Sequence, residues 1–185
     1  MTKLAVSGSH GVGKSTMTRA VAAKVEGVGI VENVMRSIAA DGFPVNVATT
    51  PGTLAEYLRR QVRLELMSAS FTHLLSDRIL VDGAAYVLAA QRMRLLRYPW
   101  GPGEIEFLVA AARLHATFFD VHLLVPIEFN FSGPDPLHAH GAEFRQAVDT
   151  TLRELLAEDW PIPLVEVTGS VEGRAATAIE LLTRN

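Results

Sequence analysis

The sequence predicts an α/β fold in which helices cover both faces of a five-stranded parallel sheet. Five short apolar or β-branched runs are typical of buried strands, and they cover residues 4–8, 29–32, 72–77, 120–126 and 164–169. Amphipathic helical periodicity separates these runs. Strands that alternate with helices are typical of parallel sheets, whose ligands bind at the carboxyl ends of the strands. We therefore expect the functional residues at the strand ends.

Helices are predicted in the segments between and after the strands. They cover residues 14–26, 33–41, 53–70, 81–96, 103–118, 142–158 and 171–182. A stretch with two prolines and two glycines, residues 99–103, separates two of them. The longest helix is expected to begin with a capping box, in which Thr53 is followed three residues later by Glu56.

The composition is that of one globular domain over residues 1–185. Hydrophobic residues make up 49% of the chain and charged residues 20%, and the net charge is −3. This acidic balance argues against duplex nucleic acid and acidic membranes as partners. The sequence has no cysteine, which excludes disulfides and thiolate chemistry, and no apolar run near the roughly 20 residues of a membrane span. Because no long apolar segment precedes the first glycines, we expect no secretory signal and a cytoplasmic protein.

A glycine-rich loop follows the first predicted strand and matches G-x-x-x-x-G-K-[ST]. With the residue after it, the loop comprises Gly8, Ser9, His10, Gly11, Val12, Gly13, Lys14, Ser15 and Thr16. Its glycines allow successive backbone N–H groups to form a concave anion site, at which the dipole of the following helix is also aimed. Lys14 can reach the β- and γ-phosphates, and the Ser15 hydroxyl can bind Mg²⁺. The loop therefore predicts a nucleoside triphosphate with Mg²⁺; the alternative is a strand–helix turn without a ligand.

Three classes of nucleoside triphosphate protein are then possible: a kinase, a GTPase switch and an ATPase motor. The sequence contains neither the D-x-x-G string of a GTPase nor its guanine-binding N-K-x-D. The third strand ends in Asp77-Arg78 and not in the D-E or D-D pair that is usual in motor ATPases. These absences favour a kinase.

The residues from Asp77 to Tyr86, D-R-x-x-x-D-x-x-x-Y, carry a resemblance to a known family. The stretch resembles the strand end of small P-loop nucleoside and nucleotide kinases. It is especially similar to the ribosylnicotinamide-kinase-like group of AAA-related P-loop proteins, although Ile79 stands where that group has Ser. ENVMR at 32–36, EFRQAVD at 143–149 and VTGSVEGR at 167–174 resemble further segments of these kinases in the same order. The resemblance implies a three-layer α/β/α P-loop NTPase with sheet order 2-3-1-4-5.

The strand ends supply candidate catalytic residues. Asp77 is expected to hold Mg²⁺ through water, opposite Ser15, and its alternative role is a helix N-cap. Arg78 would neutralise the transferring phosphoryl group or grip the acceptor, or would form a surface salt bridge. Glu32 is the candidate general base for a hydroxyl acceptor, and Arg36 lies one turn further on, where it would hold the acceptor or pair with Glu32.

A lid and the walls of the two binding sites complete the expected site. The lid covers about 130–153, with a hinge at 132–141 and Arg145 as the arginine that closes over the triphosphate; the alternative is an exposed helix arginine. Gly169 and Ser170 are expected at the adenine edge. Arg59 and Arg63 on the long helix are expected to wall the acceptor pocket.

Two other clusters of side chains, one of histidines and one of arginines, lie outside this expected site in the sequence. His138 and His140 near Asp135 form a weak metal pattern, and a polar loop explains them better. Arg92, Arg94 and Arg97 would be a nucleic-acid or phosphate contact, or a solvated helix face, which we favour.

The sequence therefore predicts an ATP- and Mg²⁺-dependent phosphotransferase that acts on a small nucleoside-like or nucleotide acceptor. One alternative is a kinase for a hydroxyl of a modified DNA base or a nucleic-acid end. The other is a regulatory ATPase without a small-molecule acceptor. The identity of the acceptor is not encoded in any local motif, and both a monomer and a homodimer remain open.

Overall fold

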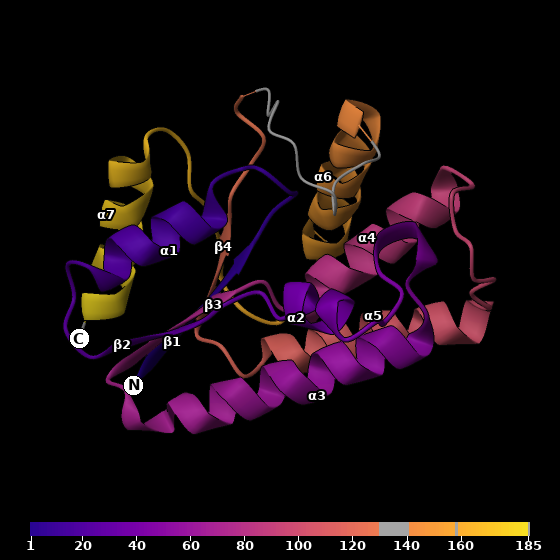
Figure 1. Cartoon of the computed structure of the whole chain (residues 1–185). Helices are drawn as coiled ribbons and strands as arrows, with labels where there is room; N and C mark the ends of the chain where they lie inside the picture. Colours follow the sequence, from indigo (N-terminus) through magenta and orange to yellow (C-terminus); the bar gives the residue numbers. More distant parts are fainter. Residues whose placement is uncertain (130–140, 158, 185) are drawn as a thin grey trace.

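Five parallel strands form one sheet in the order β2-β3-β1-β4-β5 (Figure 1). They are β1 (Thr2–Ser7), β2 (Val28–Val31), β3 (His73–Asp77), β4 (Val121–Leu124) and β5 (Leu164–Glu166). The computed structural model of the chain describes residues 1–129, 141–157 and 159–184. The predicted strands and the predicted order 2-3-1-4-5 are confirmed.

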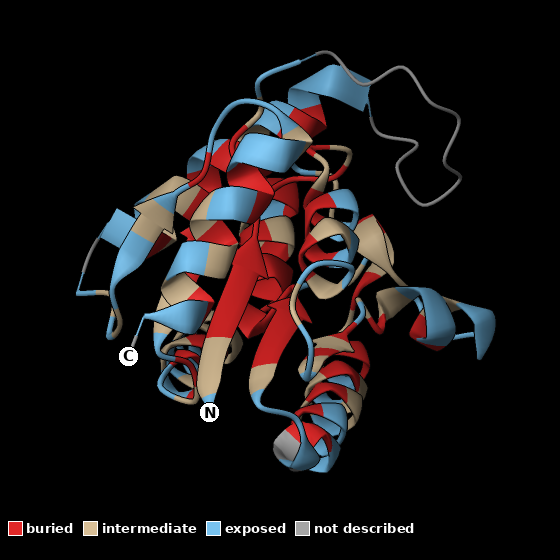
Figure 2. Cartoon of the chain, turned by 90° about the vertical axis from the view of Figure 1, so that its left-hand side faces the viewer, coloured by how far each residue is buried: buried red, intermediate tan, exposed pale blue. Residues whose placement is uncertain are grey.

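Helices α1 (Lys14–Ala22) and α7 (Val171–Thr183) cover one face of the sheet (Figure 1). Side chains of a strand alternate between the two faces. Leu4 and Val6 of β1 therefore face this layer, where they pack with Met17 of α1 and Ala178 of α7. Figure 2 shows the resulting buried residues along the central strands.

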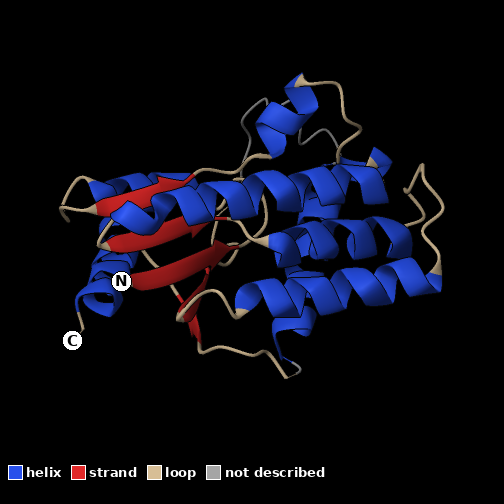
Figure 3. Ribbon diagram, turned by 90° about the horizontal axis from the view of Figure 1, so that it is seen from below, coloured by secondary structure: helices blue, strands red, loops and turns tan. Residues whose placement is uncertain are grey.

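The opposite face is covered by α3 (Pro51–Met67), α4 (Leu80–Arg92), α5 (Pro102–Ala116) and α6 (Gly141–Ala157). Ala5 of β1, which lies between Leu4 and Val6, belongs to this core. Figure 3 shows long helices of this layer lying side by side. The short helix α2 (Met35–Ala40) and the 3₁₀ turn η1 (Asn46–Ala48) connect β2 to α3, and a second turn, η2 (Ser68–Ser70), follows α3.

The long helix α3 begins two residues earlier than predicted. Thr50 is its N-cap: the Thr50 hydroxyl accepts a hydrogen bond from the Thr53 amide at 3.2 Å, and the Thr53 hydroxyl accepts one from the Thr50 amide at 3.4 Å. The predicted capping pair of Thr53 and Glu56 is therefore wrong. Pro51 explains the shift, because proline has no N–H to lose and its fixed φ suits the first helical position.

Part of the predicted lid lies outside the described residues. This applies to residues 130–140, which include most of the predicted hinge, the histidines His138 and His140, and Asp135. The remainder of the predicted lid, residues 141–153, belongs to α6. Among the described residues there is no group of three or more potential metal-binding His, Cys, Asp or Glu side chains, and no helix long and apolar enough to cross a membrane.

Candidate active site

The glycine-rich loop joins β1 to α1 at the carboxyl end of the sheet. Its glycines Gly8, Gly11 and Gly13 have φ values of 152°, 67° and 91°, which L side chains rarely adopt. At Gly8, a Cβ atom would lie 2.4 Å from the carbonyl oxygen of Val125, so a side chain does not fit there. Helix α1 begins at Lys14, as the motif predicts. The loop therefore has the backbone that an anion site of this kind requires.

The side chain of Lys14 turns back onto the glycine-rich loop. Its Nζ donates hydrogen bonds to the carbonyl oxygens of Gly8, at 2.9 Å, and Ser9, at 2.7 Å. Burial, together with the nearby Arg78 guanidinium, lowers the pKa of Lys14 to about 7, although Asp77 opposes the shift. The lysine has no directly paired carboxylate in the described part of the chain, so an anionic ligand would stabilise its charged form.

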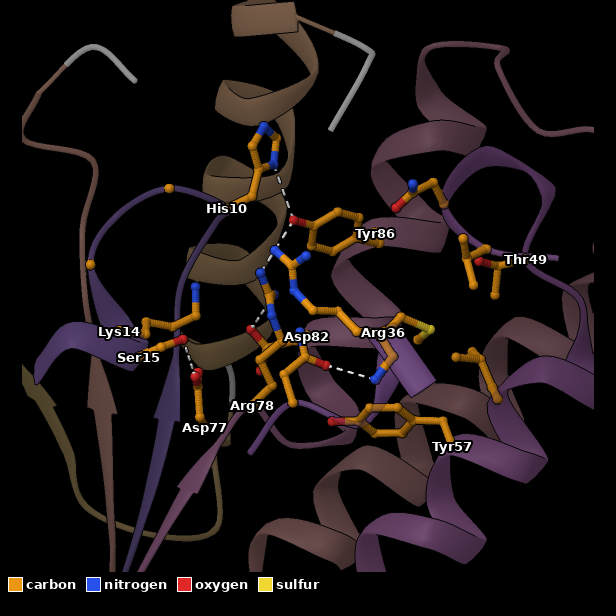
Figure 4. A pocket seen from close by; sticks show the side chains of 18 of the residues that line it. His10, Lys14, Ser15, Arg36, Thr49, Tyr57, Asp77, Arg78, Asp82 and Tyr86 are labelled. Carbon is orange, nitrogen blue, oxygen red and sulfur yellow. Dashed lines mark hydrogen bonds and ion pairs between the residues drawn. The ribbon is translucent and has the colours of Figure 1, made fainter. Parts of the chain in front are cut away.

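Asp77 and Ser15 are brought together by the strand register. Asp77 pairs with Val6, which places its side chain beside the beginning of the loop. The Ser15 hydroxyl donates a hydrogen bond to Asp77 Oδ2 (Figure 4). Asp77 Oδ1 is buried and has no hydrogen-bond partner within the described residues. A serine hydroxyl beside a carboxylate oxygen with spare capacity is a donor set that suits Mg²⁺, a hard cation that prefers oxygen.

Arg78 follows directly and is also buried. Its NH1 group donates to Asp82 Oδ1 at 3.1 Å and to the Gly8 carbonyl at 3.3 Å, and its NH2 group donates to the Tyr86 hydroxyl at 3.4 Å (Figure 4). His10 of the loop contacts the same hydroxyl through Nδ1 at 3.1 Å. The Arg78 guanidinium is thus held between the glycine-rich loop and helix α4.

Asp82 lines the cavity and belongs to the D-R-x-x-x-D-x-x-x-Y stretch, but no role was predicted for it. Besides Arg78, its carboxylate accepts hydrogen bonds from the Ser7 hydroxyl at 2.6 Å and from the amides of Gly8, at 3.3 Å, and Ile79, at 3.1 Å. One carboxylate therefore joins the end of β1, the glycine-rich loop and the first turn of α4. The spacing D-x-x-x-Y after Asp77-Arg78 was the signal that pointed to it.

Arg145 of α6 contacts the glycine-rich loop from above. Its guanidinium donates to the carbonyl oxygens of His10 at 2.9 Å, Phe129 at 2.8 Å and Gly11 at 3.4 Å. The Ser9 hydroxyl donates to the Arg145 carbonyl at 2.9 Å. The predicted lid arginine thus lies against the loop, its donors are engaged with backbone oxygens, and it is only 6% exposed; its role as a lid stays a prediction.

These residues line one cavity of about 500 Å³. At one end lie the loop residues from His10 to Thr16 with Asp77 and Arg78. The other end lies among α2, α3 and α4, and its lining is apolar and aromatic with a few polar groups: Asn33, Met35, Arg36, Val45, Asn46, Thr49, Leu54, Tyr57 and Tyr86. The Tyr57 hydroxyl is buried and makes no hydrogen bond to any described residue. Figure 4 shows Tyr57 and Arg36 on the same side of the site as Asp82.

Glu32 is not brought to this cavity. Its side chain is 67% exposed and pairs with Arg19 of α1 at 3.0 Å. Glu32 follows Val31, the last residue of β2, which is buried. The carboxylate therefore lies on the side of α1, whereas Asn33 and Arg36 reach the cavity.

Arg59 and Arg63 also lie elsewhere. Arg59 is exposed and forms two hydrogen bonds, both of 2.7 Å, to Glu56. Both arginines line a separate apolar groove between α3 and α5 that includes Leu66 and Phe107. The acceptor end of the cavity is walled by other residues of α3, Leu54 and Tyr57.

Gly169 and Ser170, which were predicted to lie at the adenine edge, form hydrogen bonds within the chain. The Gly169 amide donates to the Glu128 carboxylate at 2.9 Å, and Ser170 caps α7 by accepting from the Gly173 amide at 3.1 Å. Arg174 pairs with Glu128 and donates to the Val12 carbonyl of the loop at 2.6 Å. The sequence offered a stacking contact with the base or a solvated helix arginine for Arg174; its contact with the loop joins two segments 162 residues apart.

The model of the AAA domain family matches residues 3–174. The chain belongs to the AAA domain family. The search of the curated proteins found no match.

Solved structures similar to this AAA domain chain have the kinase fold. Deoxyadenosine kinase from M. mycoides, with dCMP and dCDP bound, has a TM-score of 0.70 at 12% identity over 97% of this chain and 98% of that one. Thymidylate kinase from Candida albicans has a TM-score of 0.75 at 16% identity over 98% and 90%. NadR in complex with NR has a TM-score of 0.68 at 18% identity over 98% of this chain and 49% of that one. The predicted resemblance to P-loop kinases is confirmed at the level of the family and the fold.

Proposed function

We propose that this chain is an ATP- and Mg²⁺-dependent phosphotransferase that acts on a small nucleoside-like or nucleotide acceptor. The observation that carries the proposal is the single cavity shared by the glycine-rich loop, the Ser15–Asp77 pair and the apolar, aromatic pocket. Its volume of about 500 Å³ is in the range of small-molecule sites. A pocket that held only a triphosphate would not need the second, aromatic end.

The donor end binds the triphosphate through the chain's own groups. The loop amides and the N-terminus of α1 bind phosphate oxygens. Lys14 Nζ exchanges its bonds to the Gly8 and Ser9 carbonyls for the β- and γ-phosphates. Ser15 and Asp77 would hold Mg²⁺, which supplies charge neutralisation at the β- and γ-oxygens. Arg78 and Arg145 add positive charge beside the loop.

The acceptor end supports a nucleoside-like molecule. Tyr86 and Tyr57 offer aromatic surface, and Asn33 and Thr49 offer polar groups. The similar structures include a deoxyadenosine kinase with dCMP and dCDP bound, a thymidylate kinase, and NadR in complex with NR. By this analogy the acceptor of the present chain belongs to the same chemical class.

The cavity does not contain Glu32, the general base expected from the sequence. Asp77 and Asp82 are the described carboxylates that line the cavity. Asp82 already accepts four hydrogen bonds, whereas Asp77 Oδ1 has none from the described residues. Because Asp77 would hold Mg²⁺ and Asp82 is engaged, the described carboxylates of the cavity leave no free general base for a hydroxyl acceptor; a monophosphate acceptor would need none.

The test is ADP release in the presence of Mg²⁺ and a panel of nucleosides and nucleoside monophosphates. Stimulation by one member supports the proposal and also decides between a hydroxyl and a phosphate acceptor. A constant basal rate with every member would support the alternative of a regulatory ATPase. The nucleic-acid alternative is less favoured, because Arg92 of the basic cluster pairs with Glu154 and donates to Thr151 at 3.2 Å. The cytoplasmic location and the homodimer stay predictions.

A further inference from the structure

The backbone of Arg78 has an unusual conformation for a residue with a side chain. Its φ is 81°, in the left-handed region, where a Cβ atom is crowded. Such conformations persist only where the surrounding structure holds them, and they concentrate at functional sites. Arg78 is also buried in the cavity wall, with its guanidinium directed to Asp82 and Tyr86 (Figure 4). The conformation of its backbone therefore decides where its charge lies.

A buried polar network lies behind this residue, on the side away from the glycine-rich loop. Gln61 Nε2 lies 3.1 Å from the Arg78 carbonyl oxygen, 2.5 Å from Ser76 Oγ and 2.9 Å from Glu65 Oε1, and its two N–H groups are shared among these three acceptors. The Ser76 hydroxyl lies 3.1 Å from Glu65 Oε1 and 3.2 Å from the Arg78 carbonyl, either of which can accept its proton. Gln61, Glu65 and Ser76 are at most 1% exposed.

His115 of α5 extends the network to the other side of the same turn. Its Nε2 lies 2.8 Å from Glu65 Oε2, and its Nδ1 accepts a hydrogen bond from the Leu80 amide at 3.3 Å. Since Nδ1 accepts, we assign the proton to Nε2, which donates to Glu65. The network therefore ends on the Arg78 carbonyl and on the Leu80 amide, the peptide groups on either side of Ile79.

We propose that Gln61, Glu65, Ser76 and His115 are positioning residues that hold Arg78 in its left-handed conformation and so aim its guanidinium into the cavity. A carboxylate in a core is costly, and apolar side chains of the same volume usually stabilise a core at least as well. Here Gln61, Ser76 and His115 instead contact the turn that carries Arg78, and the Glu65 carboxylate lies within hydrogen-bond distance of all three. On the other side, the Arg78 amide is fixed by the Val6 carbonyl at 2.8 Å, so both peptide groups of the residue are clamped.

The conformational part of this inference is independent of the proposed function, and its catalytic consequence rests on that function. Two variants test it: Gln61→Met, which removes the amide at similar volume, and Ser76→Ala, a smaller change that leaves the core filled if Gln61→Met fails to fold. The matched control is Thr151→Val, which removes another buried hydroxyl, on α6, that accepts from Arg92.

The first measurement is the pair of ¹³Cα and ¹³Cβ chemical shifts of Arg78, which report its backbone conformation by NMR. We expect both shifts to move away from left-handed values in Gln61→Met, to move in the same direction in Ser76→Ala, and to stay unchanged in Thr151→Val. Unchanged shifts in a folded Gln61→Met or Ser76→Ala protein would overturn the inference, whether or not any phosphotransferase activity has been found.

The second measurement is a double-mutant cycle on the activity. We expect Gln61→Met to lower kcat about tenfold or more, with the KM for ATP within about twofold of the parent value. In the Arg78→Ala background the same change should have little further effect, because Gln61 acts through Arg78. Equal losses in both backgrounds would mean that Gln61 is a structural residue only. If the parent protein transfers no phosphate, the proposed function fails, and the chemical shifts still decide the conformational claim.

Discussion

Ser15 donates a hydrogen bond to Asp77 across 62 residues of sequence. The contact joins the beginning of α1 to the end of β3, two neighbouring points at the carboxyl edge of the sheet. It places a hydroxyl and a carboxylate side by side beside Lys14, in the cavity that also contains the aromatic pocket. The proposed chemistry depends on this edge of the sheet.

Asp77→Asn should abolish Mg²⁺-dependent phosphate transfer while the protein remains folded. Asparagine keeps an oxygen that can accept a hydrogen bond from Ser15, but it has no negative charge to hold a cation. We expect kcat to fall roughly a hundredfold or more. Circular dichroism measures whether the variant is folded, and steady-state rates measure its phosphate transfer. Asp120→Asn, at the opposite end of the sheet, where Asp120 accepts from the Lys3 amide, is the control. A fully active Asp77→Asn protein would place the metal ligand elsewhere.

Triphosphate binding should take up a proton above pH 7. The pKa of Lys14 is lowered to about 7 in the free protein, so at pH 8 the amine is mostly neutral, and bound phosphates would raise this pKa and recharge it. Calorimetry with a non-hydrolysable ATP analogue, in two buffers of different ionisation enthalpy, should give nearly one proton per site at pH 8. Lys14→Arg, which stays charged, should take up none. Equal proton uptake by the two proteins would contradict the assignment to Lys14.

The protein should lose stability on acidification because of His122. This histidine of β4 is fully buried, neither ring nitrogen has a hydrogen-bond partner in the described part of the chain, and burial lowers its pKa to about 3. The unfolded state therefore binds more protons than the folded state between about pH 6.5 and 3. In this window the free energy of unfolding falls by about 1.4 kcal/mol per pH unit as the pH decreases.

His122→Phe tests this cause, since it keeps a ring against Trp160. Urea unfolding at pH 7 and pH 5 should show that the parent protein loses roughly 2 kcal/mol more than the variant over this interval. The same pH dependence in both proteins would show that His122 is not responsible.

Tyr57→Phe should weaken acceptor binding and leave ATP binding unchanged. The Tyr57 hydroxyl lines the cavity and has no hydrogen-bond partner among the described residues, so a polar group of the acceptor is its expected partner. We expect the KM for the acceptor to rise about tenfold, as for one lost hydrogen bond, with little change in stability. Leu54→Ala, another change in the same wall, would alter packing but not this polar contact. An unchanged KM in Tyr57→Phe would remove the hydroxyl from the acceptor site.

The strands, the loop and the Asp77-Arg78 strand end could be predicted because each depends on a short stretch of sequence. Residues at the carboxyl ends of neighbouring parallel strands must lie close together, so Ser15 and Asp77 could be paired without a structure. The predicted start of α3 was wrong by two residues, because the sequence offers two possible N-caps, Thr50 before Pro51 and Thr53.

Side-chain direction and long-range contacts could not be predicted in the same way. Glu32 follows a strand, and its direction depends on where the strand ends and on Arg19 of α1. The contact of Arg145 with the His10 carbonyl spans 135 residues, and that of Glu65 with His115 spans 50. Such contacts are decided by how the helices pack, which no local pattern records.

Transfer of a radiolabelled γ-phosphate from ATP to the panel of nucleosides and monophosphates tests the central claim most directly. The account predicts that one class of acceptor becomes labelled, and that the label is lost when EDTA removes the metal or when Lys14 is replaced by alanine. Label that appears only as inorganic phosphate, or a Lys14→Ala protein that still labels an acceptor, would contradict it.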